Sequence, residues 1–74
     1  MGTETFPQRL RRMRERRGIS CSALSELCGL SINTVRSYEK EICRPGVDAA
    51  ISLAEFFEVS VDYLLCRTDD PRKI

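Results

Sequence analysis

Apolar residues recur at intervals of three and four over most of the chain, and short polar segments containing glycine, proline or serine separate one such stretch from the next. This period is that of an α-helix with one buried face. No stretch shows the strict alternation of a half-buried strand, and no internal repeat is visible. The pattern therefore predicts an all-α domain of five short helices, at about residues 5–17, 20–28, 32–40, 47–57 and 60–65.

The stretch from Ser20 to Glu39 reads as two helices joined by a tight turn, and the rest of the chain is organised around it. Ser20 and Ser31 are suited to cap the two helices, because a serine hydroxyl can accept an unpaired amide of the first helical turn. Gly29, between them, can take the left-handed conformation that ends a helix. An apolar pair packed across such a turn is a helix-turn-helix. Its expected inner face comprises Leu24, Leu27, Cys28, Val35 and Tyr38.

The remaining helices are expected to cover that inner face, which the pair cannot bury alone. The first matches a capping box, in which Thr5 caps the helix, Pro7 lies in the first turn and Gln8 reaches back. Gly18 ends this helix, and Ser60 caps the fifth. The apolar stripes expected to face the core comprise Phe6, Leu10 and Met13 in the first helix, Val47, Ala50, Ile51, Ala54 and Phe57 in the fourth, and Val61, Leu64 and Leu65 in the fifth.

The length of 74 residues predicts one domain with a marginal core. We place the domain at residues 1–66 and a short C-terminal tail, expected to fray, at residues 67–74. The chain has no apolar run near the length of a membrane span, and its first residues lack the basic start and apolar core of a signal peptide. We therefore expect a cytoplasmic protein without membrane contact.

Charge is distributed unevenly along the chain. The net charge is only +1, but residues 1–44 hold nine Lys and Arg residues against five acids, a net +4, whereas residues 45–74 carry a net −3. A basic half and an acidic half are typical of a protein that binds a polyanion with one face. An unevenly charged soluble surface is the alternative, and charge alone does not separate the two. The arginines of the first helix, in the same way, form either part of the basic face or a solvated surface.

The four cysteines do not predict a metal site. Cys21, Cys28, Cys43 and Cys66 are widely spaced, contain no CxxC pair, and occur in a chain without histidine. Free thiols are expected in a reducing cytosol, with Cys28 filling core volume. The chain also lacks a glycine-rich phosphate loop and a nucleophile–base pair, so we expect no enzyme and no cofactor. No small-molecule effector is apparent from the sequence.

A series of short motifs runs along the chain from Arg9 to Leu65. It comprises Arg9 and Arg14, Gly18-Ile19-Ser20, Leu24, Gly29-Leu30-Ser31, Thr34-Val35, Tyr38-Glu39, Pro45, Leu53-Ala54, and Val59-Ser60-Val61-Asp62-Tyr63-Leu64-Leu65. Each motif is weak alone, but their order and spacing are specific. In this series the chain resembles the lambda-repressor-like (Cro and XRE type) helix-turn-helix DNA-binding domains. The resemblance implies a compact five-helix domain, commonly dimeric, whose third helix enters the major groove of double-stranded DNA.

The residue types on the outer side of the third helix agree with this implication. Asn33 can pair with the N6 and N7 atoms of adenine, Ile32 can contact a thymine methyl, and Arg36 can reach guanine or a phosphate. Amides at the Ser20 N-terminus would favour a phosphate, and family position adds further backbone contacts. The predicted DNA-binding residues are Ser20, Cys21, Ser31, Ile32, Asn33, Thr34, Arg36, Ser37, Lys40 and Arg44.

Three positions depart from the family pattern. Cys21 stands where the family often has Gln, Glu41 where it often has Gly, and Ser25 where an Ala is usual. Ser25 is a small packing change if its hydroxyl bonds the preceding helical turn. The resemblance also implies an ion pair between Arg14 and Glu39, whereas Arg36 is the alternative partner of Glu39 on its own helix.

The predicted function is a sequence-specific DNA-binding transcriptional regulator, and a repressor in particular. The alternative is a protein-interaction module with a repressor-like fold, antitoxin-like or bound by an antirepressor. A homodimer on a palindromic operator is expected, because one helix reads few base pairs. Its expected interface comprises Leu53, Phe56, Val61 and Leu65, which exceed the needs of a small core. Cys21, near arginines at a helix N-terminus, is a candidate for redox control through a lowered thiol pKa.

Overall fold

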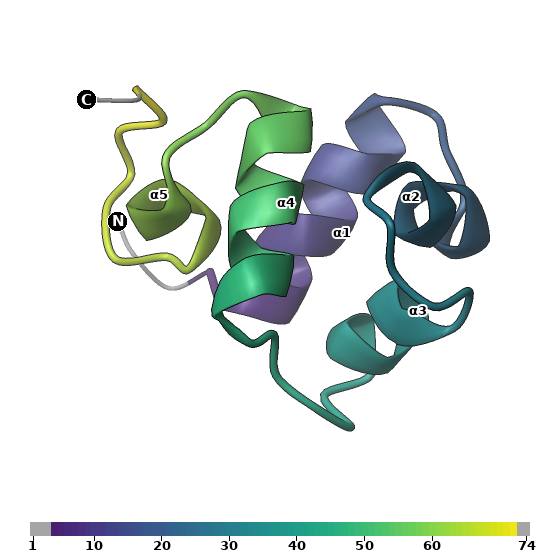
Figure 1. Cartoon of the computed structure of the whole chain (residues 1–74). Helices are drawn as coiled ribbons and strands as arrows, with labels where there is room; N and C mark the ends of the chain where they lie inside the picture. The colour runs from purple at the N-terminus through teal and green to yellow at the C-terminus, as the bar shows by residue number, and fades with distance from the viewer. Residues whose placement is uncertain (1–3, 73–74) are drawn as a thin grey trace.

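Five α-helices joined by short turns make up residues 4–72, the part of the chain that the computed structural model describes (Figure 1). They confirm the predicted all-α architecture. The helices are α1 (Phe6–Arg16), α2 (Cys21–Leu27), α3 (Thr34–Glu39), α4 (Val47–Phe57) and α5 (Val61–Leu64).

The predicted boundary signals of three helices act as expected. Gln8 accepts the backbone amide of Thr5 through Oε1 at 3.0 Å, as in a capping box. The hydroxyls of Ser20 and Ser60 accept the amides of Ala23 and Tyr63, each at 3.0 Å. Local sequence therefore determines where α1, α2 and α5 begin.

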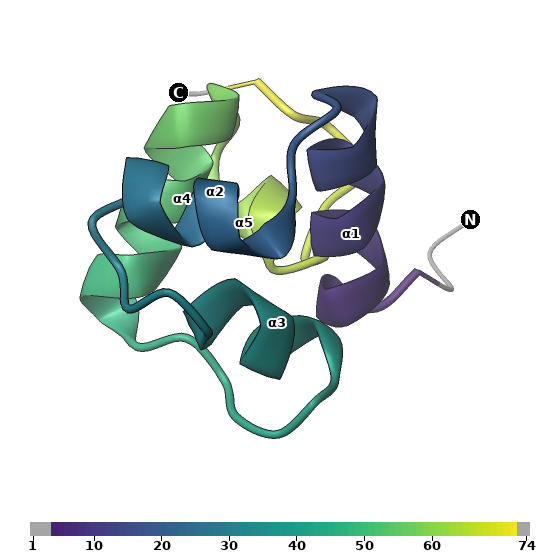
Figure 2. The same ribbon diagram turned by 90° about the vertical axis from the view of Figure 1, so that its right-hand side faces the viewer.

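Each helix contributes one completely buried aliphatic side chain to a common core. These are Leu10, Leu24, Val35, Leu53 and Leu64. Burying an aliphatic side chain of this size stabilises a fold by about 1.5–3 kcal/mol. In the resulting arrangement α2 packs on α3, α4 on α5, and α1 against both α3 and α5 (Figures 1 and 2). The helix pair α2–α3 therefore rests on one side of the core, with α5 on the other.

Several predicted core positions are wrong. Leu27, the last residue of α2, is 62% exposed, whereas the next residue, Cys28, packs against the core. In α4 the buried stripe runs through Ala50, Leu53, Ala54 and Phe57, at the spacing of one helix face. Leu53 therefore belongs to the core rather than to a dimer surface. Val47 and Ile51, which were expected to be buried, lie beside this stripe and are exposed.

The segment after α5, which we expected to fray, contacts the rest of the domain through Thr68, Asp69 and Pro71. Arg9, only 4% exposed, donates through Nη1 to the carbonyls of Tyr63 and Thr68, and through Nη2 to Asp69 at 2.8 Å. Its Nε donates to Glu4 at 2.7 Å. A buried guanidinium thus joins the start of the described chain to its end. Residues 73 and 74 lie outside the described range.

Candidate nucleic-acid interface

The turn between α2 and α3 has the predicted left-handed glycine. Gly29 has a φ of 72°, and its amide donates to the carbonyl of Glu26. The Leu30 amide donates to the Ser25 carbonyl at 2.8 Å, which closes the end of α2. The turn sets α3 across α2, so that one face of α3 is turned to the core and the other is left outside (Figure 2).

The start of α3 differs from the prediction. The helix begins at Thr34, so Ile32 and Asn33 lie in the preceding turn rather than in the helix. Ser31, the predicted cap, instead accepts the Thr34 amide with its backbone carbonyl at 2.9 Å. Asn33 holds the cap position, but its side chain makes no cap hydrogen bond. The local signal at Ser31 therefore did not determine where α3 begins.

A residue of α2 supplies the missing acceptor. The Oγ atom of Ser25 accepts the Val35 amide at 3.0 Å, and Ser25 has no exposed surface. Ser25 would have been a small packing change if its hydroxyl bonded the preceding turn, but the partner of the hydroxyl lies in the next helix. A serine on the apolar face of α2, next to Leu24, was the only signal in the sequence.

None of the predicted DNA-binding residues is buried in the core, as expected if they form an outer face. On α3, Val35 and Tyr38 are buried, while Arg36 is exposed. Exposed members of the predicted set are Ser20, Ser31, Ile32, Asn33, Arg36, Lys40 and Arg44. Cys21, Thr34 and Ser37 are half-buried. The structure therefore brings the turn before α3, the outer side of α3 and the segment after it onto an accessible surface.

Most arginines of α1 are occupied within the domain. Arg12 pairs with Glu4 at 2.7 Å and donates to the Tyr63 hydroxyl. Arg11 pairs with Glu15. Arg17, the residue directly after α1, lies over the Phe56 ring, with 5.1 Å between its guanidinium carbon and the ring centroid. With Arg9 and Arg14 also engaged, the basic run of α1 is largely used in intramolecular contacts.

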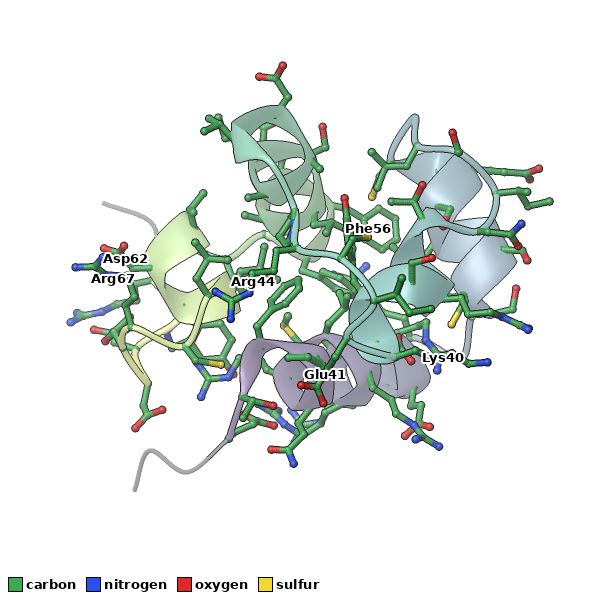
Figure 3. The ribbon with its side chains drawn as sticks, turned by 90° about the horizontal axis from the view of Figure 1, so that it is seen from below. Lys40, Glu41, Arg44, Phe56, Asp62 and Arg67 are labelled. Atoms are coloured by element: carbon green, nitrogen blue, oxygen red, sulfur yellow. The ribbon has the colours of Figure 1, made fainter. Side chains whose placement is uncertain are left out.

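The basic residues around α3 are available instead. Arg36, Lys40 and Arg44 are exposed and form no ion pair with the residues that the structure describes. Figure 3 shows Lys40, Glu41 and Arg44 on the side of the molecule that carries the segment after α3. Three unpaired cations, interrupted by one carboxylate, give this surface a modest positive charge.

Arg14 and Glu39 form the predicted ion pair between α1 and the end of α3. Arg14 Nε lies 2.7 Å from Oε2 of Glu39, and Nη2 lies 3.1 Å from Oε1. Arg14 also donates to the carbonyl of Ile19 at 2.8 Å. The hydrogen bonds to Glu39 raise the pKa of the Arg14 guanidinium. The pair holds α3 at its C-terminal end, opposite the Ser25 contact at its N-terminal end.

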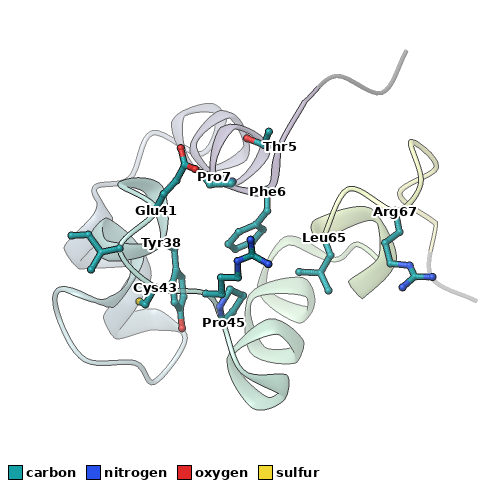
Figure 4. Close-up of a pocket in the computed structure, with 11 residues that line it drawn as sticks. Thr5, Phe6, Pro7, Tyr38, Glu41, Cys43, Pro45, Leu65 and Arg67 are labelled. Atoms are coloured by element: carbon teal, nitrogen blue, oxygen red, sulfur yellow. The ribbon is translucent and has the colours of Figure 1, made fainter.

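Glu41, immediately after α3, has a φ of 61°. This left-handed conformation is unfavourable for residues other than glycine. The segment then passes an open groove of about 700 Å³, whose apolar lining includes Phe6, Tyr38, Pro45 and Leu65 (Figure 4). Exposed Ile42 and Val47 lie in the same part of the chain. Apolar surface is therefore present along the segment that follows α3.

The environment of Cys21 contradicts the expected lowered pKa. Burial raises the pKa of this thiol, and the neighbouring Glu39 carboxylate adds to the rise, against the influence of Arg14 and Arg36. The described residues contain no cluster suited to a metal ion. In the same range, no helix has both the length and the apolarity to cross a membrane.

Comparison with known sequences shows to which family this architecture belongs. A model of the helix-turn-helix family matches residues 10–64. The HTH-type transcriptional regulator YobD of Bacillus subtilis, itself uncharacterised, is 39% identical over 66 residues, which are 89% of this chain and 59% of YobD. MJ1164 of Methanocaldococcus jannaschii, a regulatory protein assigned to the same type, is 38% identical over 50 residues, 68% of this chain and 16% of that protein. The chain thus spans less than two thirds of the length of these relatives.

Solved structures agree with the sequence comparison. The P22 c2 repressor in complex with a synthetic operator has a TM-score of 0.79 and 27% identity, covering 85% of this chain and 96% of the repressor chain. The N-terminal DNA-binding domain of SinR from Bacillus subtilis has a TM-score of 0.74 and 28% identity, with 81% and 88% coverage. Both are similar to this chain over most of their own length.

Proposed function

The chain belongs to the helix-turn-helix family, and from this premise we propose that it is a sequence-specific regulator of transcription that binds double-stranded DNA, acting as a repressor. One observation carries the proposal. The outer face formed by Ile32, Asn33 and Arg36 is exposed, while the ends of α3 are held by Ser25 and by Arg14. A helix fixed in this way can present its first residues to base edges in the major groove.

In the proposed complex the contacts divide into two kinds. Asn33 and Arg36 read bases through hydrogen bonds, and Ile32 makes an apolar contact. Lys40 and Arg44 neutralise phosphates and position the protein without reading sequence. Ser20, Cys21, Ser31, Thr34 and Ser37 complete the proposed contact set. In this proposal the protein is not an enzyme, and it acts in the cytoplasm.

Selection of duplexes from a random library tests this function directly. We expect enrichment of one motif, and a loss of about 1–3 kcal/mol at a single base pair in the Asn33→Ala variant. Glu58→Ala, at the far end of α4, is the control and is expected to select the wild-type motif. If no motif is enriched, the protein-interaction alternative replaces DNA binding.

We also propose a homodimer that binds two half-sites about 34 Å apart. The support is the apolar surface after α3, where Ile42 and Leu65 line the groove and Val47 is exposed. Of the interface predicted from sequence, Leu53 is buried in the core. Sedimentation of the protein with a selected duplex measures the stoichiometry. One protomer per duplex at saturation, with a footprint lacking two-fold symmetry, would refute the dimer and leave DNA binding intact.

A further inference from the structure

Ser25 joins the two helices of the helix-turn-helix at a completely buried point. Its Oγ accepts the Val35 amide at 3.0 Å, and its backbone carbonyl accepts the Leu30 amide at 2.8 Å. One residue of α2 therefore fixes both the turn that follows α2 and the first turn of α3.

α3 depends on this contact because it has no local cap. The capping residues Ser20 and Ser60 have extended backbones, with ψ of 165° and 155°, and each accepts an amide of its own helix. Asn33 has a ψ of 5° and makes no such bond. A six-residue helix has little stability of its own, so its first turn relies on tertiary contacts.

We infer that Ser25 is a positioning residue for DNA recognition, which acts by capping α3 from α2. The inference rests on the proposed function. Ser25 is buried and makes no DNA contact itself. Through the Val35 amide it determines where α3 begins and how α3 is oriented, and with this the directions in which Asn33 and Arg36 project.

The consequence of losing the hydroxyl follows from the burial of Val35, which has no exposed surface. Without Ser25 Oγ the Val35 amide has no acceptor and no access to water, which is unfavourable. A shift or unwinding at the start of α3 would give the Val35 amide another partner. It would also displace Asn33 and Arg36, which face the bases in the proposed complex. Discrimination between base pairs therefore depends on Ser25.

Ser60 provides a matched control. Its hydroxyl also accepts a backbone amide at 3.0 Å in the first turn of a short helix, but that helix is α5, which carries none of the proposed DNA-contact residues. Removing either hydroxyl deletes one side-chain cap. The loss of stability is expected to be larger at Ser25, whose hydrogen bond is buried, than at Ser60, whose hydrogen bond is partly exposed. Only the removal at Ser25 moves the recognition helix.

The test compares wild-type protein, Ser25→Ala and Ser60→Ala. Thermal unfolding, amide hydrogen exchange at Val35, and binding to the selected duplex and its single-base substitutions are measured for each. We expect Ser25→Ala to lose protection at Val35, to bind the duplex roughly tenfold more weakly, and to discriminate less at the base pairs facing Asn33 and Arg36. Ser60→Ala is expected to keep Val35 protection and to stay within about twofold of wild-type affinity and preference.

The outcomes distinguish this inference from the proposed function. Equal affinity and an unchanged base preference in the two variants would overturn the positioning role, even if both are less stable. If wild-type protein selects no duplex, the proposed function fails, and the role of Ser25 in DNA recognition fails with it. If Ser25→Ala does not fold, Ser25→Cys fills the site with a slightly larger side chain that is a weaker acceptor, and the same comparisons apply.

Discussion

Arg14 on α1 and Glu39 at the end of α3 face one another through two hydrogen bonds, Nε to Oε2 at 2.7 Å and Nη2 to Oε1 at 3.1 Å. Their side chains are only 14% and 10% exposed. Because removing one partner leaves the other charge poorly hydrated, we expect Arg14→Ala to lower the free energy of unfolding by about 3 kcal/mol. Denaturant unfolding measures this loss.

A surface ion pair on the same helix provides the control. Arg11 and Glu15 are 66% and 55% exposed, so Arg11→Ala should change stability by less than about 0.5 kcal/mol. Equal effects of the two substitutions would show that the Arg14–Glu39 pair has no special role in holding α3.

The predictability of the site differs between the two ends of α3. Arg14 and Glu39 were paired through the family resemblance, and the structure confirms them. The Ser25 contact was missed because a serine in a helix usually bonds its own backbone, and nothing in the sequence indicated a partner ten residues away. The five helices could be predicted because apolar spacing is a local property of the sequence. The cap of α3 could not, because it is a contact between two helices.

The electrostatic contribution to DNA binding is expected to come from α3 and the segment after it. Three unpaired cations, Arg36, Lys40 and Arg44, predict a slope of log affinity against log salt of about −3 per protomer. Lys40→Ala should reduce its magnitude by about one unit and weaken binding to all sequences alike. Arg16→Ala removes an exposed arginine of α1 and should leave the slope unchanged. The same loss in both variants would restore α1 to the DNA-binding surface.

Glu41→Gly should both stabilise the protein and strengthen DNA binding. Relief of the left-handed backbone is expected to add about 0.5–1 kcal/mol to the free energy of unfolding. Loss of a carboxylate next to Lys40 should raise affinity as well. Glu58→Gly is the matched control, because Glu58 has a φ of 58° at the end of α4, away from α3. It should stabilise the fold to a similar degree without changing affinity in a binding titration.

Stability is expected to fall in acid through Glu4. Its hydrogen bond from Arg12, together with that from Arg9, lowers the pKa of this carboxyl from 4.5 to about 2. A lowered folded-state pKa contributes stability above pH 4.5, which is lost as the pH falls from there towards 2. Unfolding measured across this range should show a shallower pH dependence in Glu4→Gln. Parallel curves for the variant and the wild type would exclude Glu4 as the source.

Cys21 should be a slow thiol. Because burial and Glu39 raise its pKa, little thiolate forms near neutral pH. Cys43 is exposed, so we expect iodoacetamide to modify Cys43 before Cys21 in a time course followed by mass spectrometry. Mild oxidation that spares Cys21 should leave DNA affinity unchanged. Preferential modification of Cys21 would revive the redox hypothesis.

The guanidinium of Arg9 makes the two ends of the chain interdependent. It binds Glu4 on one side and Asp69 and the Thr68 carbonyl on the other, and all of these residues lie outside the segment 10–64 that matches the family model. A fragment trimmed to the family limits would discard this cluster, and one cut after α5 would keep Arg9 without its C-terminal partners. The smallest expression unit that keeps all the partners of Arg9 therefore extends from Glu4 to Asp69.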